Sequence, residues 1–154
     1  MSIYFLDSSA IAKRYVSEQG HTWIISLCDP EQNHELYISQ AALVEVVAAI
    51  CRRTREQSIT ITDRDRLIHA FRLDCMNNYN ILRITSPICT SAGNLCRSYR
   101  LRAYDAVQLA CALRLRDKAL AKEMEAPIFV SADNELLSFA AVEELIVENP
   151  SNHP

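Results

Sequence analysis

Short apolar segments alternate with longer helical segments along the whole chain, and this alternation restricts its possible folds more than any other feature. Each apolar segment has only four or five residues and is rich in Ile, Val, Leu, Phe and Tyr, which is typical of strands. Several are apolar on both faces, as in a parallel sheet that helices cover. The expected strands are residues 3–7, 36–39, 81–85, 128–131 and 145–148.

Helical patterns fill the intervals between these strands. Strands that alternate with helices predict an α/β domain with a mostly parallel sheet and right-handed crossovers. We expect a single domain over residues 1–148, followed by a polar tail, residues 149–154, that frays. The expected helices are residues 9–17, 21–28, 40–56, 63–77, 87–99, 103–124 and 134–140.

The composition excludes several classes of protein. The net charge is −3, so any contact with nucleic acid has to come from a local patch or through a cation. Only two glycines occur, which excludes a P-loop and a GxGxxG dinucleotide motif. The cysteines form no CxxC pair and the histidines are scattered, so a zinc site is not expected. Without a signal peptide or a long apolar run, we expect a cytoplasmic protein that crosses no membrane.

Four acidic residues stand out by their positions in this pattern. Asp7 and Asp133 follow the first and fourth expected strands, where an alternative role for each is to cap the next helix. Asp105 opens an almost wholly apolar helix, where an acid complements the helix dipole. Glu45 is expected mid-helix in the run AALVEVVAAI, where it caps nothing and has alanines as its neighbours.

Glu45 needs a compensating partner if it is buried, because an unpaired carboxylate is costly in an apolar environment. One interpretation is that it faces solvent or pairs with Arg52 or Arg53. Those arginines are seven and eight positions away, which is a poor spacing for a pair within one helix. The other interpretation is that the compensating partner is a metal ion.

The four acids are expected to converge, because ligands of an open parallel sheet bind beyond the carboxyl ends of its strands. Clustered carboxylates repel, by about 4 kcal/mol for two charges 4 Å apart at an effective dielectric near 20. Such a cluster therefore needs shared protons or a cation, and hard oxygen ligands favour Mg²⁺ or Mn²⁺. The predicted metal ligands are Asp7, Glu45, Asp105 and Asp133.

The segments YFLDSSAIAKRY, LRAYDAVQLACAL and IFVSADNELL, together with Glu45, resemble the acidic motifs of PIN domains, specifically the VapC-type toxins of bacterial toxin–antitoxin pairs. The resemblance covers about residues 3–148. It implies a five-stranded parallel sheet with helices on both faces and a Mg²⁺-dependent endoribonuclease, with Mn²⁺ as a possible substitute. It also implies a small antitoxin protein as partner and a homodimer.

The resemblance assigns roles to individual residues. Asp7 and Asp105 would be the principal metal ligands, Ser9 would orient Asp7, and Ser131 would do the same near Asp133. The four acids would hold one or two ions that activate a water for attack on phosphorus. The chain departs from many relatives, which have His in place of Gln108 and Thr in place of Cys111. Neither position is a metal ligand in the family, so we expect little effect on the chemistry.

RNA is negatively charged, so it can approach an acidic site only along basic side chains. Arg97, Arg100 and Arg102 precede Asp105 and could contact the RNA backbone, although solvated arginines at a helix end are an alternative interpretation. Two other functions stay open, namely a PIN nuclease of RNA processing and a non-catalytic PIN-like binding module. An aspartyl phosphatase is disfavoured because the first strand ends in DSS rather than in a DxD pair.

Overall fold

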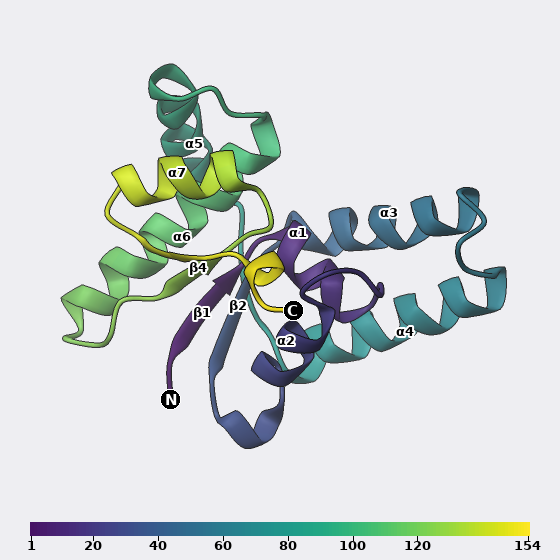
Figure 1. Ribbon diagram of the computed structural model, residues 1–154. Coiled ribbons are helices and arrows are strands. Elements are labelled where there is room, and N and C mark those ends of the chain that lie inside the picture. The colour runs from purple at the N-terminus through teal and green to yellow at the C-terminus, as the bar shows by residue number, and fades with distance from the viewer.

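Five parallel strands form one sheet in the order β3-β2-β1-β4-β5 (Figure 1). The computed structural model describes residues 1–154. Phe5 in β1 pairs with Tyr37 in β2 on one side and with Phe129 in β4 on the other. The predicted five-stranded parallel sheet is therefore confirmed. The strands are β1 (Ile3–Leu6), β2 (Glu35–Ser39), β3 (Asn80–Leu82), β4 (Ile128–Val130) and β5 (Ile146–Glu148).

Strand β3 is shorter than expected, since it ends at Leu82 instead of reaching Thr85. It is an edge strand with β2 as its only neighbour. Beyond Leu82 the backbone ladder to β2 gives way to a side-chain bond, because the backbone N–H of Ile84 donates to the side chain of Gln40 at 3.0 Å. Thr85 is then the N-cap of the following helix.

Seven α-helices and three short 3₁₀ helices connect the strands. The first expected helix, residues 9–17, is shorter and divides into one α-turn and one 3₁₀ turn. None of the helices combines the length and the apolar character that a membrane span needs. The helices are α1 (Ser8–Ile11), η1 (Ala12–Arg14), α2 (His21–Leu27), η2 (Pro30–Gln32), α3 (Ala42–Arg55), α4 (Ile61–Asn77), α5 (Ser86–Ser98), α6 (Ala103–Ala121), α7 (Asn134–Val142) and η3 (Pro150–Asn152).

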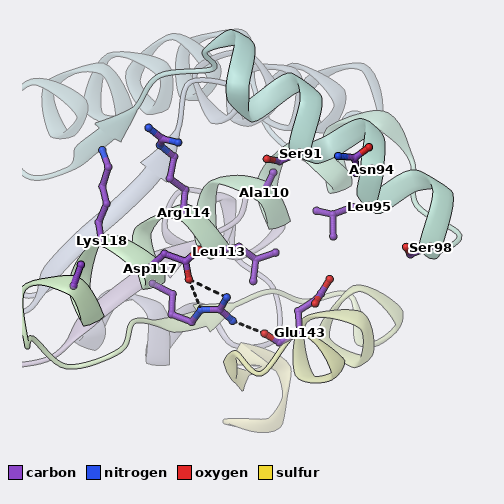
Figure 2. A pocket seen from close by; sticks show the side chains of 12 residues that line it. Ser91, Asn94, Leu95, Ser98, Ala110, Leu113, Arg114, Asp117, Lys118 and Glu143 are labelled. Atoms are coloured by element: carbon purple, nitrogen blue, oxygen red, sulfur yellow. Dashed lines mark hydrogen bonds and ion pairs between the residues drawn. The ribbon is translucent and has the colours of Figure 1, made fainter.

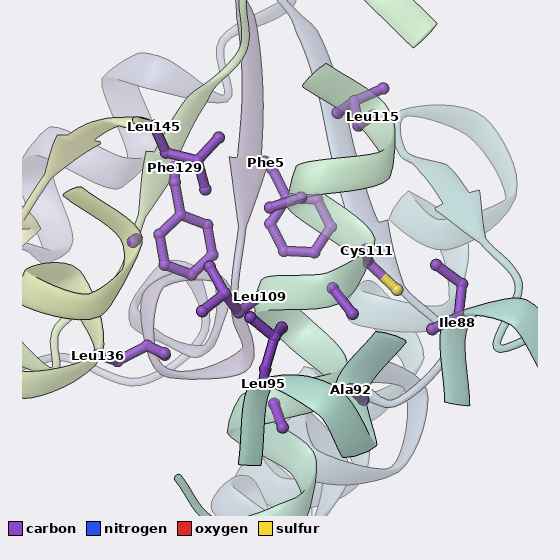
Figure 3. Close-up of a cluster of buried hydrophobic side chains, with 14 of the residues drawn as sticks. Phe5, Ile88, Ala92, Leu95, Leu109, Cys111, Leu115, Phe129, Leu136 and Leu145 are labelled. Atoms are coloured by element: carbon purple, nitrogen blue, oxygen red, sulfur yellow. The ribbon is translucent and has the colours of Figure 1, made fainter. Parts of the chain in front are cut away.

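The sheet separates two hydrophobic cores, because alternate residues of a strand point to opposite faces. Phe5 and Phe129 stack with ring centroids 5.8 Å apart and face Leu109 of α6 (Figure 3). Leu6 and Val130, their neighbours in sequence, belong to the core beneath α1, α2, α3 and α4. Figure 1 shows α5, α6 and α7 on one side of the sheet and the other four helices opposite. The expected helical layers on both faces are confirmed.

The carboxyl ends of the central strands meet at one edge of the sheet. The backbone N–H of Asp7 donates to the carbonyl of Val130 at 3.0 Å, one residue beyond the end of β1. The N–H of Ser131 donates in turn to the carbonyl of Glu148 at 3.1 Å. These bonds continue the ladder past the strands, so that Asp7 and Ser131 lie next to each other at the sheet edge.

Residues 149–153 pack against the domain, which differs from the expectation that residues 149–154 fray. Pro150 is buried and begins the 3₁₀ helix η3. The His153 ring stacks on Trp23 of α2, with centroids 4.3 Å apart and planes inclined by 5°. Gly20 allows this packing, because a Cβ at this position would lie 2.6 Å from the Pro150 carbonyl oxygen.

Candidate active site

Asp7 is a buried carboxylate whose two oxygens both accept hydrogen bonds. Oδ1 accepts from the Ser9 hydroxyl at 2.6 Å and from the backbone N–H of Ala10 at 2.9 Å, so that Asp7 also caps α1. Oδ2 accepts from the Ser131 hydroxyl at 2.6 Å. Burial raises the pKa of Asp7 to about 6, against the lowering effect of these hydrogen bonds, and the charge of Asp105 adds to the rise.

Glu45 lies in the first turn of α3, which corrects the expectation that it is mid-helix. Its Oε1 accepts hydrogen bonds from the Ser8 hydroxyl at 2.7 Å and from Nε2 of Gln108 at 3.1 Å. Arg53 forms its ion pair with Glu18, at 2.9 Å, and not with Glu45. A hydroxyl and an amide, and not an arginine of the same helix, are therefore the partners of Glu45 in this structure.

Gln108 is at the centre of this network, although we expected this position to matter little. The residue is buried and only 2% exposed. Oε1 accepts from the Ser39 hydroxyl at 3.0 Å, and Nε2 donates to the Ser8 hydroxyl at 2.7 Å as well as to Glu45. Sequence reasoning missed Ser8, Ser39 and Gln108. The available signal was a glutamine inside an apolar helix, one turn after Asp105, because a buried amide needs hydrogen-bond partners.

Asp105 lies half-buried in the first turn of α6. Burial raises its pKa, the neighbouring charges of Asp133 and Glu45 raise it further, and Arg102 opposes the rise. Asp133 is the N-cap of α7 and accepts two backbone N–H bonds there, so its expected alternative role as a cap is present in the structure. The charge of Asp105 thus acts on Asp7, and the charges of Asp133 and Glu45 act on Asp105.

The four predicted acids share one edge of the sheet but not one coordination shell. The charge of Asp105 raises the pKa of Asp7, and the charges of Asp133 and Glu45 raise the pKa of Asp105. No three Asp, Glu, His or Cys side chains lie close enough together to hold one metal ion. The side-chain arrangement therefore differs from the expected shared site, because Glu45 is held by Ser8 and Gln108 and Asp133 is held by its own helix.

Two cavities of similar size flank the acids. One, of about 560 Å³, is lined by Asp105, Asp133, Arg100 and Arg102. The other, of about 590 Å³, is lined by three further acids, Glu18, Glu45 and Glu56, and again by Arg102. Arg102 thus lies between the two cavities. Additional cations of the second cavity are Lys13, Arg52 and Arg53.

Arg97, the third predicted substrate arginine, lines neither of these cavities. A further cavity of about 610 Å³ lies between α5, α6 and the end of α7, and contains none of the predicted site residues (Figure 2). Within it Arg116 binds the side chain of Asp117 at 3.0 Å and the backbone carbonyl of Glu143. The acids and their flanking arginines therefore form a site separate from this cavity.

The sequence model of the PIN domain matches residues 4–142 of the chain. The chain belongs to the PIN domain family. A comparison with curated proteins found no significant match.

Solved structures share the fold of this PIN domain at low sequence identity. FitAcB from Neisseria gonorrhoeae is 16% identical, with a TM-score of 0.64 and 99% of each chain covered. VapBC2 from Rickettsia felis, bound to a DNA fragment from its promoter, is 14% identical, with a TM-score of 0.58 over 96% of this chain and 98% of that one. Mycobacterium tuberculosis VapC20, a toxin that cleaves the sarcin–ricin loop, is 16% identical, with a TM-score of 0.59 over 89% and 94%.

Proposed function

We propose that this PIN domain is a metal-dependent endoribonuclease and the toxin of a bacterial type II toxin–antitoxin pair. The observation that carries the proposal is the juxtaposition of acids from separate parts of the chain at the carboxyl edge of the sheet. Asp7 and Asp105, which are 98 positions apart, lie close enough for the charge of one to raise the pKa of the other. Acids whose pKa values are raised by burial and by neighbouring acids beside a cavity are typical of functional sites.

The donor set fits a hard divalent cation. The candidate ligands at this edge are carboxylate and hydroxyl oxygens, with no His or Cys among them, and Mg²⁺ or Mn²⁺ prefers such ligands. Asp7, Glu45, Asp105 and Asp133 would hold the ion partly through water ligands that Mg²⁺ retains, since no three of them lie close enough together to coordinate it directly. Asp105 would be the most accessible direct ligand, because no hydrogen bond occupies its carboxylate. When bound, a divalent ion supplies an activated water and charge stabilisation for phosphodiester hydrolysis.

The residues around the acids have separate tasks in this proposal. Ser9 and Ser131 hold the two oxygens of Asp7 in fixed directions through hydrogen bonds of 2.6 Å each. Ser131 also accepts the backbone N–H of Asp133 at 3.1 Å, which links the two acids through one hydroxyl. Ser131 therefore orients both Asp7 and the loop that carries Asp133.

The RNA would run along the two cavities with its phosphates on the basic side chains. Arg100 and Arg102 line the cavity with Asp105, and Arg52 lines the one with Glu45. Cations along such a groove attract the phosphate backbone without reading base sequence. We assign Arg97 a peripheral role, since it lies outside both cavities.

Structural neighbours support the toxin assignment by analogy. They include a toxin–antitoxin complex from Klebsiella pneumoniae, at 16% identity and a TM-score of 0.58 over 96% of this chain and 97% of that one, and the sarcin–ricin-loop-cleaving toxin. The proposal accordingly includes an RNA substrate, a small antitoxin partner, a homodimer and a cytoplasmic location. A non-toxin nuclease of RNA processing would use the same site.

A second candidate function is a non-catalytic binding module. The observation in its favour is that no three of the acids lie within one coordination shell. Metal binding separates the two candidates, because the nuclease requires an ion at the acids and the binding module does not.

The decisive experiment is RNA cleavage by the purified protein. A mixed rRNA and tRNA pool is incubated with Mg²⁺ or Mn²⁺, and in parallel with EDTA. Asp7→Asn and Asp105→Asn remove one carboxylate each, while Asp65→Asn makes the same change on the exposed face of α4. Discrete cleavage that needs the metal, Asp7 and Asp105 but not Asp65 supports the proposal. Cleavage that survives Asp7→Asn, or absence of both cleavage and metal binding, contradicts it.

A further inference from the structure

We propose that Gln108 is a positioning residue that holds Glu45 so that one of its two oxygens stays available for the cation. This inference rests on the proposed function, because it concerns the same metal site. It assigns a role to a residue that is not an acid, does not line either flanking cavity and is almost completely buried.

The orientation of the Gln108 amide follows from its surroundings. An ionised carboxylate only accepts hydrogen bonds, whereas a hydroxyl donates or accepts. The NH₂ end of the amide must therefore face Glu45, because the opposite orientation would bring two acceptors together. Ser39, fully buried at the end of β2, then donates to Oε1 of Gln108 at 3.0 Å and completes the arrangement.

The three polar groups at Glu45 form a closed ring of hydrogen bonds. One N–H of Gln108 donates to the Ser8 hydroxyl at 2.7 Å, and the other donates to Oε1 of Glu45 at 3.1 Å. The Ser8 hydroxyl donates its own proton to the same Oε1 at 2.7 Å. Both hydrogen bonds end on Oε1, so Oε2 is left to serve as a single-oxygen ligand.

Gln108 also connects the segments that carry the principal acids. It lies one helical turn after Asp105 in α6, and Ser8 follows Asp7 directly in sequence. The bond to Glu45 spans 63 positions and the bond to Ser8 spans 100. A change at Gln108 therefore alters the position of Glu45 relative to Asp7 and Asp105, as well as its rotamer.

The test measures Mn²⁺ affinity by isothermal titration calorimetry on the full chain, with thermal unfolding of the same samples. Gln108→Met keeps the length of the side chain and removes its donors. Ser39→Ala removes the anchor of the amide without touching any acid. Leu115→Ala, a buried change in the same helix, is the matched control for a purely structural effect.

We expect Gln108→Met to weaken Mn²⁺ binding by about tenfold or more, as changes to the hydrogen-bond partners of metal ligands typically do. Ser39→Ala should weaken it less, and Leu115→Ala should lower the melting temperature most while binding Mn²⁺ as the natural chain does. Unchanged affinity in Gln108→Met overturns the inference, as does an affinity loss that simply follows the loss of stability. A natural chain that binds no Mn²⁺ overturns the metal site itself and this inference with it.

Discussion

The hydroxyl of Ser131 donates a hydrogen bond to Oδ2 of Asp7 at 2.6 Å, although the two residues are 124 positions apart in sequence. Asp7 follows β1 and Ser131 follows β4, and these strands are neighbours in the sheet. Asp7 is 4% exposed, so each hydrogen-bond donor to its carboxylate affects how easily it ionises. The ionisation of Asp7 thus depends on a residue that follows β4, far from Asp7 in sequence.

Ser131→Ala should raise the pKa of Asp7 above its value of about 6, because the lost hydrogen bond favours the charged carboxylate. Near pH 7.5 the free energy of unfolding should fall by about 1–3 kcal/mol, since a buried charged acceptor loses a donor. NMR titration of the Asp7 carboxyl carbon and urea unfolding measure the two effects. Ser138→Ala, an exposed serine of α7, is the control. An unchanged Asp7 pKa in Ser131→Ala would contradict the assignment.

The metal-free protein should lose stability as the pH rises from about 4 to about 6. Folded Asp7 keeps its proton up to about pH 6, whereas the unfolded chain releases it near the ordinary aspartate pKa of 3.8. The folded state therefore binds more protons in this window, and the free energy of unfolding falls with pH by up to about 3 kcal/mol. Asp7→Asn should remove most of this dependence in urea unfolding at several pH values. The same slope in the natural chain and in the variant would disprove the shifted pKa.

Mn²⁺ should stabilise the folded protein, and more so above pH 6 than below it. A cation that binds only the folded state adds about 2.7 kcal/mol at 100 times its dissociation constant. Protonated carboxyl groups bind Mn²⁺ poorly, and Asp7 is mostly protonated below its pKa of about 6. Thermal unfolding with Mn²⁺ or EDTA at two pH values measures this, with Asp105→Asn as the variant that loses the response. Equal stabilisation of Asp105→Asn would show that the ion binds elsewhere.

Arg102→Ala should weaken RNA binding more than Arg97→Ala does. Arg102 lines both cavities next to the acids, whereas Arg97 lines neither. Loss of one phosphate contact should lower the slope of log affinity against log salt concentration by about 0.7 for a single strand. Fluorescence anisotropy with the inactive Asp7→Asn background measures binding over a salt series. Equal effects of the two arginines would place the RNA on a different surface.

Gly20→Ala should detach the C-terminal segment. Gly20 has φ of 88°, and an added Cβ would lie 2.6 Å from the backbone oxygen of Pro150, which cannot rotate away. We expect a loss of stability of about 1 kcal/mol or more from the backbone conformation alone. Hydrogen exchange should become faster at residues 151–153. Gly93→Ala is the matched control, since nothing lies within 4 Å of its added Cβ. Protection that persists in Gly20→Ala would refute the tight contact.

Local patterns in the sequence were sufficient to predict the strands, the parallel sheet and the helices on both faces. Apolar periodicity reports which face of an element is buried, and this property is decided within a few residues. The positions of Asp7 and Asp133 at strand ends were predictable for the same reason. In each case a short apolar run stops, and the polar residues of the following turn come next. The length of β3 was overestimated. Its end is determined by its edge position and by the bond from Ile84 to Gln40, and both depend on a strand that is distant in sequence.

The layers of this PIN domain, and the sheet edge at which its acids lie, could thus be predicted from local sequence patterns. The side chains that hold those acids depend on how distant segments pack together. Glu45 is bound to Gln108 across 63 positions, and Gln108 to Ser39 across 69, and no local pattern contains such pairs. A buried polar group must find a partner wherever the fold brings one within hydrogen-bond distance. The partner is therefore a property of the packed molecule, whereas the need for one can already be seen in the sequence.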